Sequence, residues 1–193
     1  LGIFSFSLCF STAVKDAVLS KQAMLTEHRL QGVGPMNRPT GRLYLSSEQE
    51  LRSKLIWIAA AELGVREEGG ENQGQRVGEY LAYVGLGVGY EWCAAFVSWC
   101  YGRAGLAAPR SAWSPALFPK ARRYAAPDIR TGRIKEADLF AIYSGELRRI
   151  HHVGLVKTVN GAFVISIEGN SHDRVESRRR PLSTVYAIAN WVE

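Results

Sequence analysis

The sequence predicts an α+β domain in which helices come first along the chain and an antiparallel sheet follows. Between residues 47 and 105, apolar residues recur at the spacing of amphipathic helices. Between residues 137 and 192, four segments alternate with the period of two that is typical of strands. The dipeptide Asn160-Gly161 joins the middle two segments as a hairpin, which makes this pair antiparallel.

The first 46 residues are predicted to lie outside this domain. Residues 1–25 begin with a short apolar run that ends in small residues, similar to the hydrophobic region and cleavage site of a secretory signal peptide. An ordinary hydrophobic segment explains the run equally well, and Lys15 and Asp16 end it too early for a membrane span. Residues 26–46 have no period and several turn formers, so we expect a linker before a domain at 47–193.

Two helices are predicted ahead of the cysteine-containing segment. The first covers SSEQELRSKLIWIAAAELG, where Ser47 and Glu50 form a capping box and Gly64 ends the helix. A short helix follows at residues 76–85. Residues 109–128, by contrast, contain four prolines, which predicts a long irregular connection.

Cys93 and Cys100 lie in the stretch YEWCAAFVSWC and are assigned separate roles. On a helix, seven residues separate two Cα atoms by roughly 10 Å, which is beyond the ~7 Å reach of a disulfide. Cys100 lies between two aromatic residues and is predicted to pack in the core. Cys93 sits where the helix begins, after the glycine-rich GLGVGY, and a helix N-terminus favours a thiolate. Taken alone, Cys93 is also compatible with an inert core cysteine.

Four strands are predicted in the second half of the domain. They are the segments 137–143, 151–159, 162–170 and 183–192. The Asn-Gly turn allows two registers for the middle pair. A two-residue loop sets Glu168 opposite Val153, whereas a three-residue loop pairs Thr158 with Ala162 and sets His152 opposite Glu168. We choose the second register because it gathers the apolar residues on one face.

This register gives His152 a carboxylate within cross-strand reach, which fixes the imidazole tautomer and makes it a candidate base. If the start of the cysteine helix packs on this face, Cys93 meets His152, and a Cys–His pair is the arrangement that makes a thiol nucleophilic. Asn170, two residues beyond Glu168, is a candidate to orient the imidazole. A hydrogen-bonded histidine on a sheet and an asparagine that closes a turn remain open as alternatives.

The composition is that of an ordinary globular protein, with 47% hydrophobic and 22% charged residues. The net charge of +6 arises in the second half, where residues 103–193 carry fifteen Lys and Arg against eight Asp and Glu. These basic residues are scattered and match no nucleic-acid-binding signature, so an anionic surface such as a bacterial envelope is an equally good partner. Three cysteines and four histidines show no metal-ligand spacing, and no metal or cofactor is expected.

The segments EWCAAFVSWCY, HHVGLV and ISIEGN, in this order, resemble the CHAP domain, a cysteine, histidine-dependent amidohydrolase/peptidase. The stretch AAELGVREEGGENQGQRVGEYLAYVGLG is also similar to bacterial and phage cell-wall hydrolases of this type, and the resemblance covers about residues 47–192. It implies a papain-like fold in which a helix carrying the cysteine packs on an antiparallel sheet carrying the histidine. Ala137 departs from the family pattern, which usually has glycine before the aspartate.

The resemblance also implies an activity: hydrolysis of an amide bond in bacterial peptidoglycan, as an N-acetylmuramoyl-L-alanine amidase or a peptide endopeptidase. By motif position, Cys93 is the nucleophile, His152 the base, and Glu168 and Asn170 the orienting polar pair. We expect a secreted or envelope-located monomer without stable membrane insertion, encoded by either a bacterium or a phage.

Trp92 and Trp113 are the predicted substrate-binding side chains. Two other functions remain: a catalytically inactive domain that binds envelope or protein, and a metal-dependent hydrolase using His151, His152 and His172. The second lacks the usual spacing of histidine ligands.

Overall fold

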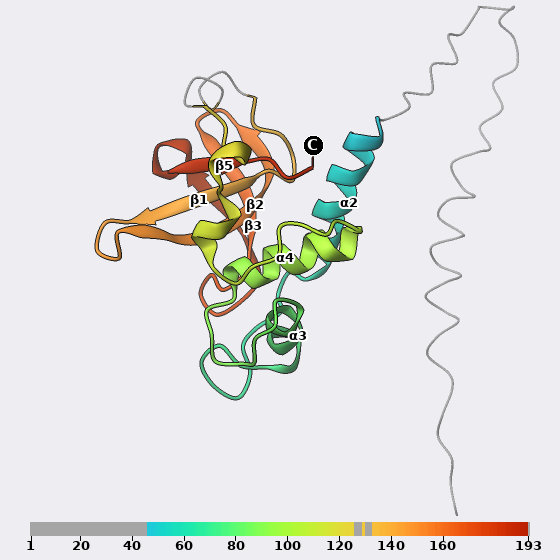
Figure 1. Cartoon of the computed structure of the whole chain (residues 1–193), viewed down its shortest axis with the longest axis vertical. Helices are drawn as coiled ribbons and strands as arrows, with labels where there is room; N and C mark the ends of the chain where they lie inside the picture. The colour runs from blue at the N-terminus through green and yellow to red at the C-terminus, as the bar shows by residue number, and fades with distance from the viewer. Residues whose placement is uncertain (1–45, 126–128, 130–132, 193) are drawn as a thin grey trace, which may run out of the picture. The chain divides into compact units, whose positions relative to one another are not determined.

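Helices precede strands along the chain, and the predicted α+β class is confirmed. The computed structural model describes residues 46–125, 129 and 133–192. Figure 1 shows the helices of the described chain: α2 (Ser47–Ala61), α3 (Gln75–Tyr83) and α4 (Cys93–Ala104). In its described part, residues 109–125, the proline-rich connection contains the short 3-10 helices η1 (Ser114–Leu117) and η2 (Lys120–Arg122), in keeping with its expected irregularity.

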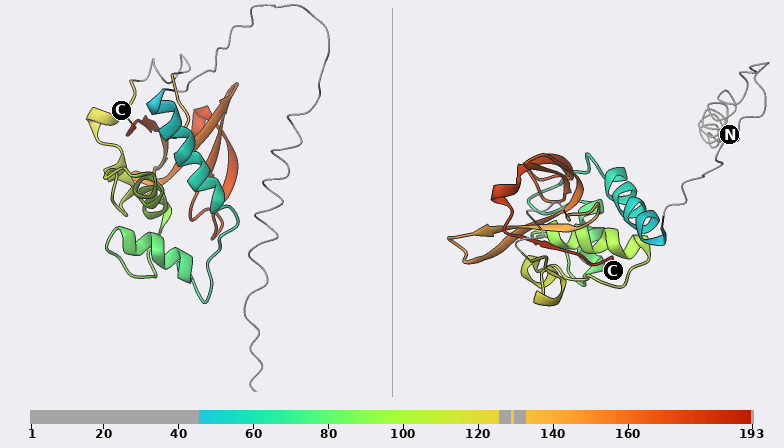
Figure 2. Two further views of the ribbon diagram at one scale, coloured as in Figure 1. Left: turned by 90° about the vertical axis from the view of Figure 1, so that its right-hand side faces the viewer. Right: turned by 90° about the horizontal axis from the view of Figure 1, so that it is seen from above.

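The strands form one antiparallel sheet in the order β4-β3-β2-β1-β5. Their bounds are β1 Leu139–Ser144, β2 Arg149–Asn160, β3 Phe163–Glu168, β4 Glu176–Pro181 and β5 Ala187–Ala189. Helix α4 packs against α2, α3 and strand β2, so it connects the helical part to the sheet. Figures 1 and 2 show α2 and α4 beside the sheet. As predicted, a helix that begins at Cys93 packs against the antiparallel sheet that carries His152.

Two strand predictions were wrong. The predicted strand at 183–192 is reduced to the three residues of β5, because the 3-10 helix η3 occupies Leu182–Thr184. Strand β4 was missed altogether. Its sequence, ESRRRP, has no alternation of apolar residues, since charged side chains on an edge strand give no hydrophobic period.

Both registers considered for the central hairpin are wrong. Asn160 pairs with Phe163, so the turn is Gly161-Ala162, with Gly161 in the left-handed region at φ 57°. A bulge between Val156 and Thr158 then shifts the pairing, and Leu155 faces Ile167. By extension, Gly154 rather than His152 lies opposite Glu168. The shift from the chosen register amounts to two residues, so the predicted faces are retained.

Helix α2 begins one residue earlier than predicted. Ser46 is its N-cap and forms the capping box with Gln49, which displaces the predicted pair of Ser47 and Glu50 by one position. The buried guanidinium of Arg52 joins the helix to the sheet region, through hydrogen bonds of 2.9 Å to Asp138 and 2.9 Å to Asn190.

Two hydrophobic clusters lie on opposite faces of the sheet. One contains most of α4 and the sheet residues Leu139, Val153 and Leu155, whereas the other contains Phe140 and Val156. Almost every residue of α4 is buried, including Cys100 at 0% exposure, and the prediction that Cys100 packs in the core is confirmed.

Ala137, the residue that departs from the family pattern, adopts φ 64° and is fully buried just before β1. Its backbone N–H donates to the carbonyl of Val156 and its own carbonyl accepts from the hydroxyl of Tyr101, both at 2.8 Å. Glycine adopts this left-handed conformation without steric cost, which gives a physical reason for a glycine there.

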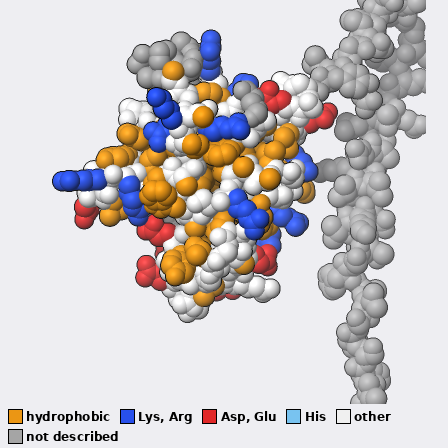
Figure 3. All heavy atoms as spheres, in the orientation of Figure 1, with side chains coloured by type: hydrophobic (Ala, Val, Ile, Leu, Met, Phe, Trp, Pro, Cys, Tyr) orange, Lys and Arg blue, Asp and Glu red, His pale blue; other side chains and the backbone are white. Residues whose placement is uncertain are grey.

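Charge is dispersed on the visible surface. Figure 3 shows Lys and Arg side chains at separate places around one face, with Asp and Glu between them. Within the described residues, no helix combines the length and hydrophobicity needed to cross a bilayer. The predicted signal-like segment and nearly all of the predicted linker lie outside the described residues.

Candidate active site

Cys93 is the first residue of α4. The first helical hydrogen bond of α4 runs from the N–H of Phe96 to the carbonyl of Trp92 at 2.8 Å, and Trp92 gives no side-chain cap. The backbone N–H groups of the first turn and the positive end of the helix dipole therefore lie around the thiol. Its sulfur is 3.4 Å from Ser114 Oγ and 3.9 Å from the carbonyl oxygen of His151, and the residue is 4% exposed.

His152 of β2 lies between the thiol and a carboxylate. Its imidazole lies close enough to Cys93 that each group shifts the pKa of the other. Its Nε2 atom is 2.7 Å from Oε2 of Glu168, the last residue of β3. Because Nε2 is engaged with the carboxylate, Nδ1 is the ring nitrogen that remains for the sulfur. The structure thus brings together three of the predicted site residues in the order Cys93, His152, Glu168.

Glu168 is fully buried and all of its acceptor capacity is used. Oε1 accepts from Ser166 Oγ at 2.5 Å and from Arg180 Nε at 2.6 Å. Oε2 accepts from His152 and, at 2.5 Å, from a terminal nitrogen of Arg180. Gly154 makes room for this carboxylate, since a Cβ atom there would lie 2.8 Å from Glu168 Cγ and 2.6 Å from Phe140 Cε1.

These contacts favour the charged form of each group. Burial opposes ionisation of Glu168, but the hydrogen bonds from Arg180 and His152 outweigh it and lower the pKa of this carboxyl to about 2. Burial also opposes the imidazolium, yet hydrogen bonds to Cys93 and Glu168 raise the pKa of His152 to about 9. Burial would raise the pKa of the Cys93 thiol, but the hydrogen bond with His152 and the charge of the imidazolium lower it.

Cys100 provides an internal comparison. Burial and the nearby charge of Glu62 raise the pKa of its thiol well above the ordinary value. Two cysteines on one helix therefore have opposite tendencies, because only one of them meets an imidazole. The cluster at Cys93 can hold a thiolate beside an imidazolium, which is the chemistry of an activated nucleophile with an adjacent proton donor.

Asn170 lies beside the start of α4 rather than against the imidazole. Its side-chain nitrogen is 3.2 Å from Asn72 Oδ1. With the carboxamide turned over, its oxygen accepts from the backbone N–H of Trp92 at 3.1 Å and its nitrogen donates to Glu67 at 3.3 Å. The predicted part of Asn170 in orienting His152 is corrected accordingly: its contacts hold the segment that precedes the cysteine.

The two predicted substrate-binding tryptophans have different surroundings. Trp92 is fully buried, stacks on Tyr80 with ring centroids 5.6 Å apart, and donates from Nε1 to Glu67 at 2.8 Å. This corrects its assignment, because a sealed indole has no surface to offer a substrate. Trp113 is 60% exposed and directly precedes Ser114, the residue in contact with the thiol. Its role in substrate binding stays a prediction.

The other histidines do not join the cluster. His172 is exposed and its Nδ1 lies 2.8 Å from Glu176. The ring centroid of His151 is 6.3 Å from that of His152, and the strand directs its backbone carbonyl, not its ring, toward the sulfur. In the described part of the chain, no group of three or more His, Cys, Asp or Glu residues is arranged to hold a metal ion.

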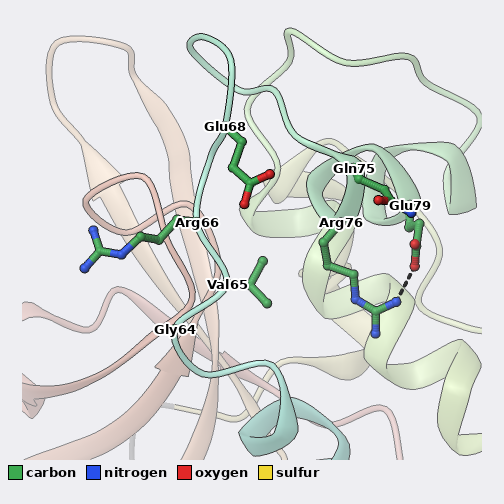
Figure 4. A pocket seen from close by; sticks show the side chains of 7 residues that line it. All are labelled: Gly64, Val65, Arg66, Glu68, Gln75, Arg76 and Glu79. Atoms are coloured by element: carbon green, nitrogen blue, oxygen red, sulfur yellow. Dashed lines mark hydrogen bonds and ion pairs between the residues drawn. The ribbon is translucent and has the colours of Figure 1, made fainter. Parts of the chain in front are cut away.

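Sequence reasoning missed three residues of the cluster: Ser114, Ser166 and Arg180. Ser114 lies in the irregular connection, where no period predicts its position. Ser166 and Arg180 lie on the same face of the sheet as Glu168, and ESRRRP has no periodic pattern that could have predicted the position of Arg180. A pocket of about 430 Å³ lies elsewhere, between the loop at 64–68 and the start of α3, and includes no member of the cluster (Figure 4).

Comparison with known protein families gives a match for part of the chain. Residues 85–170 match the CHAP domain. The resemblance noted in the sequence is confirmed over this stretch, which includes Cys93, His152, Glu168 and Asn170. Ser114 also lies inside the CHAP match, whereas Arg180 lies beyond its end.

The solved structures to which this chain is similar include those of RipB and RipA. The peptidoglycan hydrolase RipB from Mycobacterium tuberculosis is 17% identical, with a TM-score of 0.49 over 83% of this chain and 75% of that one. Two mutated forms of the resuscitation promoting factor interacting protein RipA are 13% and 14% identical, with TM-scores of 0.48 and 0.45 over 82% of this chain and 70% of theirs. A search of curated proteins finds no match.

Proposed function

We propose that this protein is a peptidoglycan hydrolase that cleaves an amide bond by a thiol mechanism. The observation that carries the proposal is the contact series from Cys93 through His152 to the buried Glu168. The CHAP match over residues 85–170 supports the same chemistry, because cysteine- and histidine-dependent amide hydrolysis defines that family. The bond cleaved lies either at the sugar–peptide junction or within the stem or cross-bridge peptides.

In the proposed mechanism, the Cys93 thiolate attacks the amide carbonyl carbon and forms a carbon–sulfur bond. The oxyanion is held by the backbone N–H of Cys93 at the helix N-terminus. His152, as the imidazolium, gives its proton to the departing amine when the carbon–nitrogen bond breaks. The neutral imidazole then takes a proton from water, whose oxygen attacks the thioester and releases the acid and the thiolate. Glu168 stabilises the imidazolium throughout.

The test is lysis of purified cell wall by a Cys93→Ala variant. We expect lysis to be lost while the circular dichroism spectrum and unfolding midpoint stay close to those of the wild type. A Cys100→Ala variant is the matched control, because it removes a thiol from the same helix and should keep lysis. Wild-type lysis by the Cys93→Ala protein would refute the nucleophile assignment. Mass spectrometry of the released muropeptides identifies which amide is cleaved.

The alternative is a catalytically inactive domain that binds the envelope or another protein. The observation in its favour is the 4% exposure of Cys93, which leaves little sulfur surface for a substrate. Iodoacetamide separates the two functions. A nucleophilic Cys93 is alkylated rapidly near neutral pH, whereas a sealed and inert Cys93 reacts no faster than Cys100. Binding to wall without alkylation or lysis would support the inactive domain.

Action on peptidoglycan requires a location at the cell envelope or outside the cell. This location is part of the proposal, as is the monomeric state. The segment at residues 1–25, which was predicted to resemble a secretory signal peptide, would direct the protein there. Fusion of residues 1–25 to a reporter enzyme tests export directly.

A further inference from the structure

Strand β4 places the guanidinium group of Arg180 next to the buried carboxylate of Glu168. Arg180 forms two parallel hydrogen bonds to Glu168, from Nε to Oε1 at 2.6 Å and from the terminal nitrogen to Oε2 at 2.5 Å. Such a fork fixes both the position and the plane of a carboxylate. The side chain of Arg180 is 21% exposed and its Cζ lies 5.8 Å from the centroid of the Phe140 ring, so the guanidinium is held between the strand and an aromatic face.

The two hydrogen bonds from Arg180 restrict how the carboxylate of Glu168 can interact with the imidazole of His152. Since Arg180 and Ser166 already donate to it, Glu168 acts only as an acceptor and its partner nitrogen on His152 must carry a hydrogen. The tautomer of His152 is thereby set with the hydrogen on Nε2, and Nδ1 is the ring nitrogen left available to Cys93.

The charges of the series balance when all groups are ionised. Thiolate, imidazolium, carboxylate and guanidinium alternate in sign and sum to zero. Loss of Arg180 would leave this buried series with a net negative charge, which disfavours the thiolate and allows Glu168 to take a proton more readily.

We propose that Arg180 is a positioning residue of the hydrolase, which acts through Glu168 and His152 to keep the Cys93 thiolate populated at mildly acidic pH. This inference rests on the proposed function. Other charged or titratable groups near the series include His151 of β2, which feels the charges of Glu91 and Arg149, and Arg178 and Glu176 of β4. Arg178 donates to Ser171 and Glu176 instead of Glu168.

Arg179 provides a matched control on the same strand. It precedes Arg180 directly, points to the opposite face of the sheet, and places its Cζ 3.2 Å from the centroid of the Phe163 ring. An Arg179→Gln variant removes the same charge from β4 without touching the carboxylate.

The experiment measures the rate of alkylation of Cys93 by iodoacetamide between pH 4 and 9, resolved by peptide mass spectrometry, in the full chain. We expect Arg180→Gln to move the acid midpoint of the rate upward by about one pH unit and to slow wall lysis near pH 6 by roughly tenfold. Arg180→Lys keeps the charge but loses the fork, so its midpoint should lie between those of the wild type and Arg180→Gln. Arg179→Gln should match the wild type.

An unchanged midpoint in a folded Arg180→Gln protein would overturn the inference. If the Arg180→Gln protein does not fold, the Arg180→Lys protein is measured instead, and a wild-type alkylation midpoint in that protein would also overturn the inference. The proposed function fails separately: wild-type lysis by Cys93→Ala would remove the hydrolase mechanism, whereas an unshifted alkylation midpoint with Cys93-dependent lysis would remove only the role of Arg180.

Discussion

Replacement of Gly154 by alanine tests whether the position of Glu168 controls the thiol. The new Cβ atom would lie 2.6 Å from Phe140 Cε1 and 2.8 Å from Glu168 Cγ, and both neighbours belong to a packed sheet face. Ordinary carbon contacts begin near 3.5 Å, so one or both groups must move by the better part of an ångström. Overpacking of this kind costs about 1–3 kcal/mol of folding free energy.

The same displacement should also slow the reactions of Cys93. Glu168 is joined to His152 by a hydrogen bond of 2.7 Å, and a shift of its side chain lengthens or breaks that bond. A hydrogen bond to a charged group contributes about 1.5–3 kcal/mol. At about 1.4 kcal/mol for each factor of ten, alkylation of Cys93 and lysis should both slow by roughly 10- to 100-fold.

Two measurements on Gly154→Ala decide the matter. Urea unfolding gives the stability change, and the alkylation rate at pH 6 gives the reactivity of the thiol. Gly145→Ala is the control, because no atom lies within 4 Å of a Cβ built there. A Gly154→Ala protein with the wild-type unfolding midpoint and alkylation rate would show that the carboxylate does not depend on this gap.

Three further predictions concern the thiol, the backbone and pH. Ser114→Ala removes a hydroxyl 3.4 Å from the sulfur and should slow alkylation by about fivefold, or ~1 kcal/mol; an unchanged rate would mean that the contact is passive. Ala137→Gly should leave the urea unfolding midpoint unchanged or raised, because glycine adopts the φ of 64° at this position without strain. The control Ala141→Gly in β1 should lower the folding free energy by about 1 kcal/mol. Equal losses of stability in the two variants would contradict backbone strain at residue 137. The stability advantage of the wild type over Glu168→Gln should be largest between pH 4.5 and 6.5, because the Glu168 pKa of about 2 lies below its ordinary 4.5 and the His152 pKa of about 9 lies above its ordinary 6.5. That advantage should decrease as the pH falls toward about 2 and as it rises through about 9, and a pH-independent difference would refute the ion pair.

The central hairpin illustrates how far sequence reasoning reached. Alternation correctly placed His152 and Glu168 on one face, because the faces of a strand repeat every two residues. It could not give the pairing, since the bulge between Val156 and Thr158 inserts one residue without any mark in the hydrophobic pattern. His152 was predicted to lie directly opposite Glu168, but it lies diagonal to it. Gly154 lies opposite the carboxylate instead.

The aromatic residues around the cysteine show a second limit. Proximity in sequence suggested that Trp92 meets substrate, but burial against Tyr80 and the hydrogen bond to Glu67 place it in the core. Exposure of a large aromatic residue depends on which elements pack over it, and no local pattern contains that information.

The sequence by itself determined the order of helices and strands, the position of Cys93 at a helix start, and the face that carries His152. These follow from local periodicity and from glycine-rich breaks, which depend only on neighbours along the chain. Only the tertiary structure decided that β4 joins the sheet beside β3 and delivers Arg180 to Glu168. A charged edge strand is selected by its hydrogen-bonding partner, β3, and by the buried anion that it neutralises, Glu168, and neither of these produces a hydrophobic period in the sequence of β4.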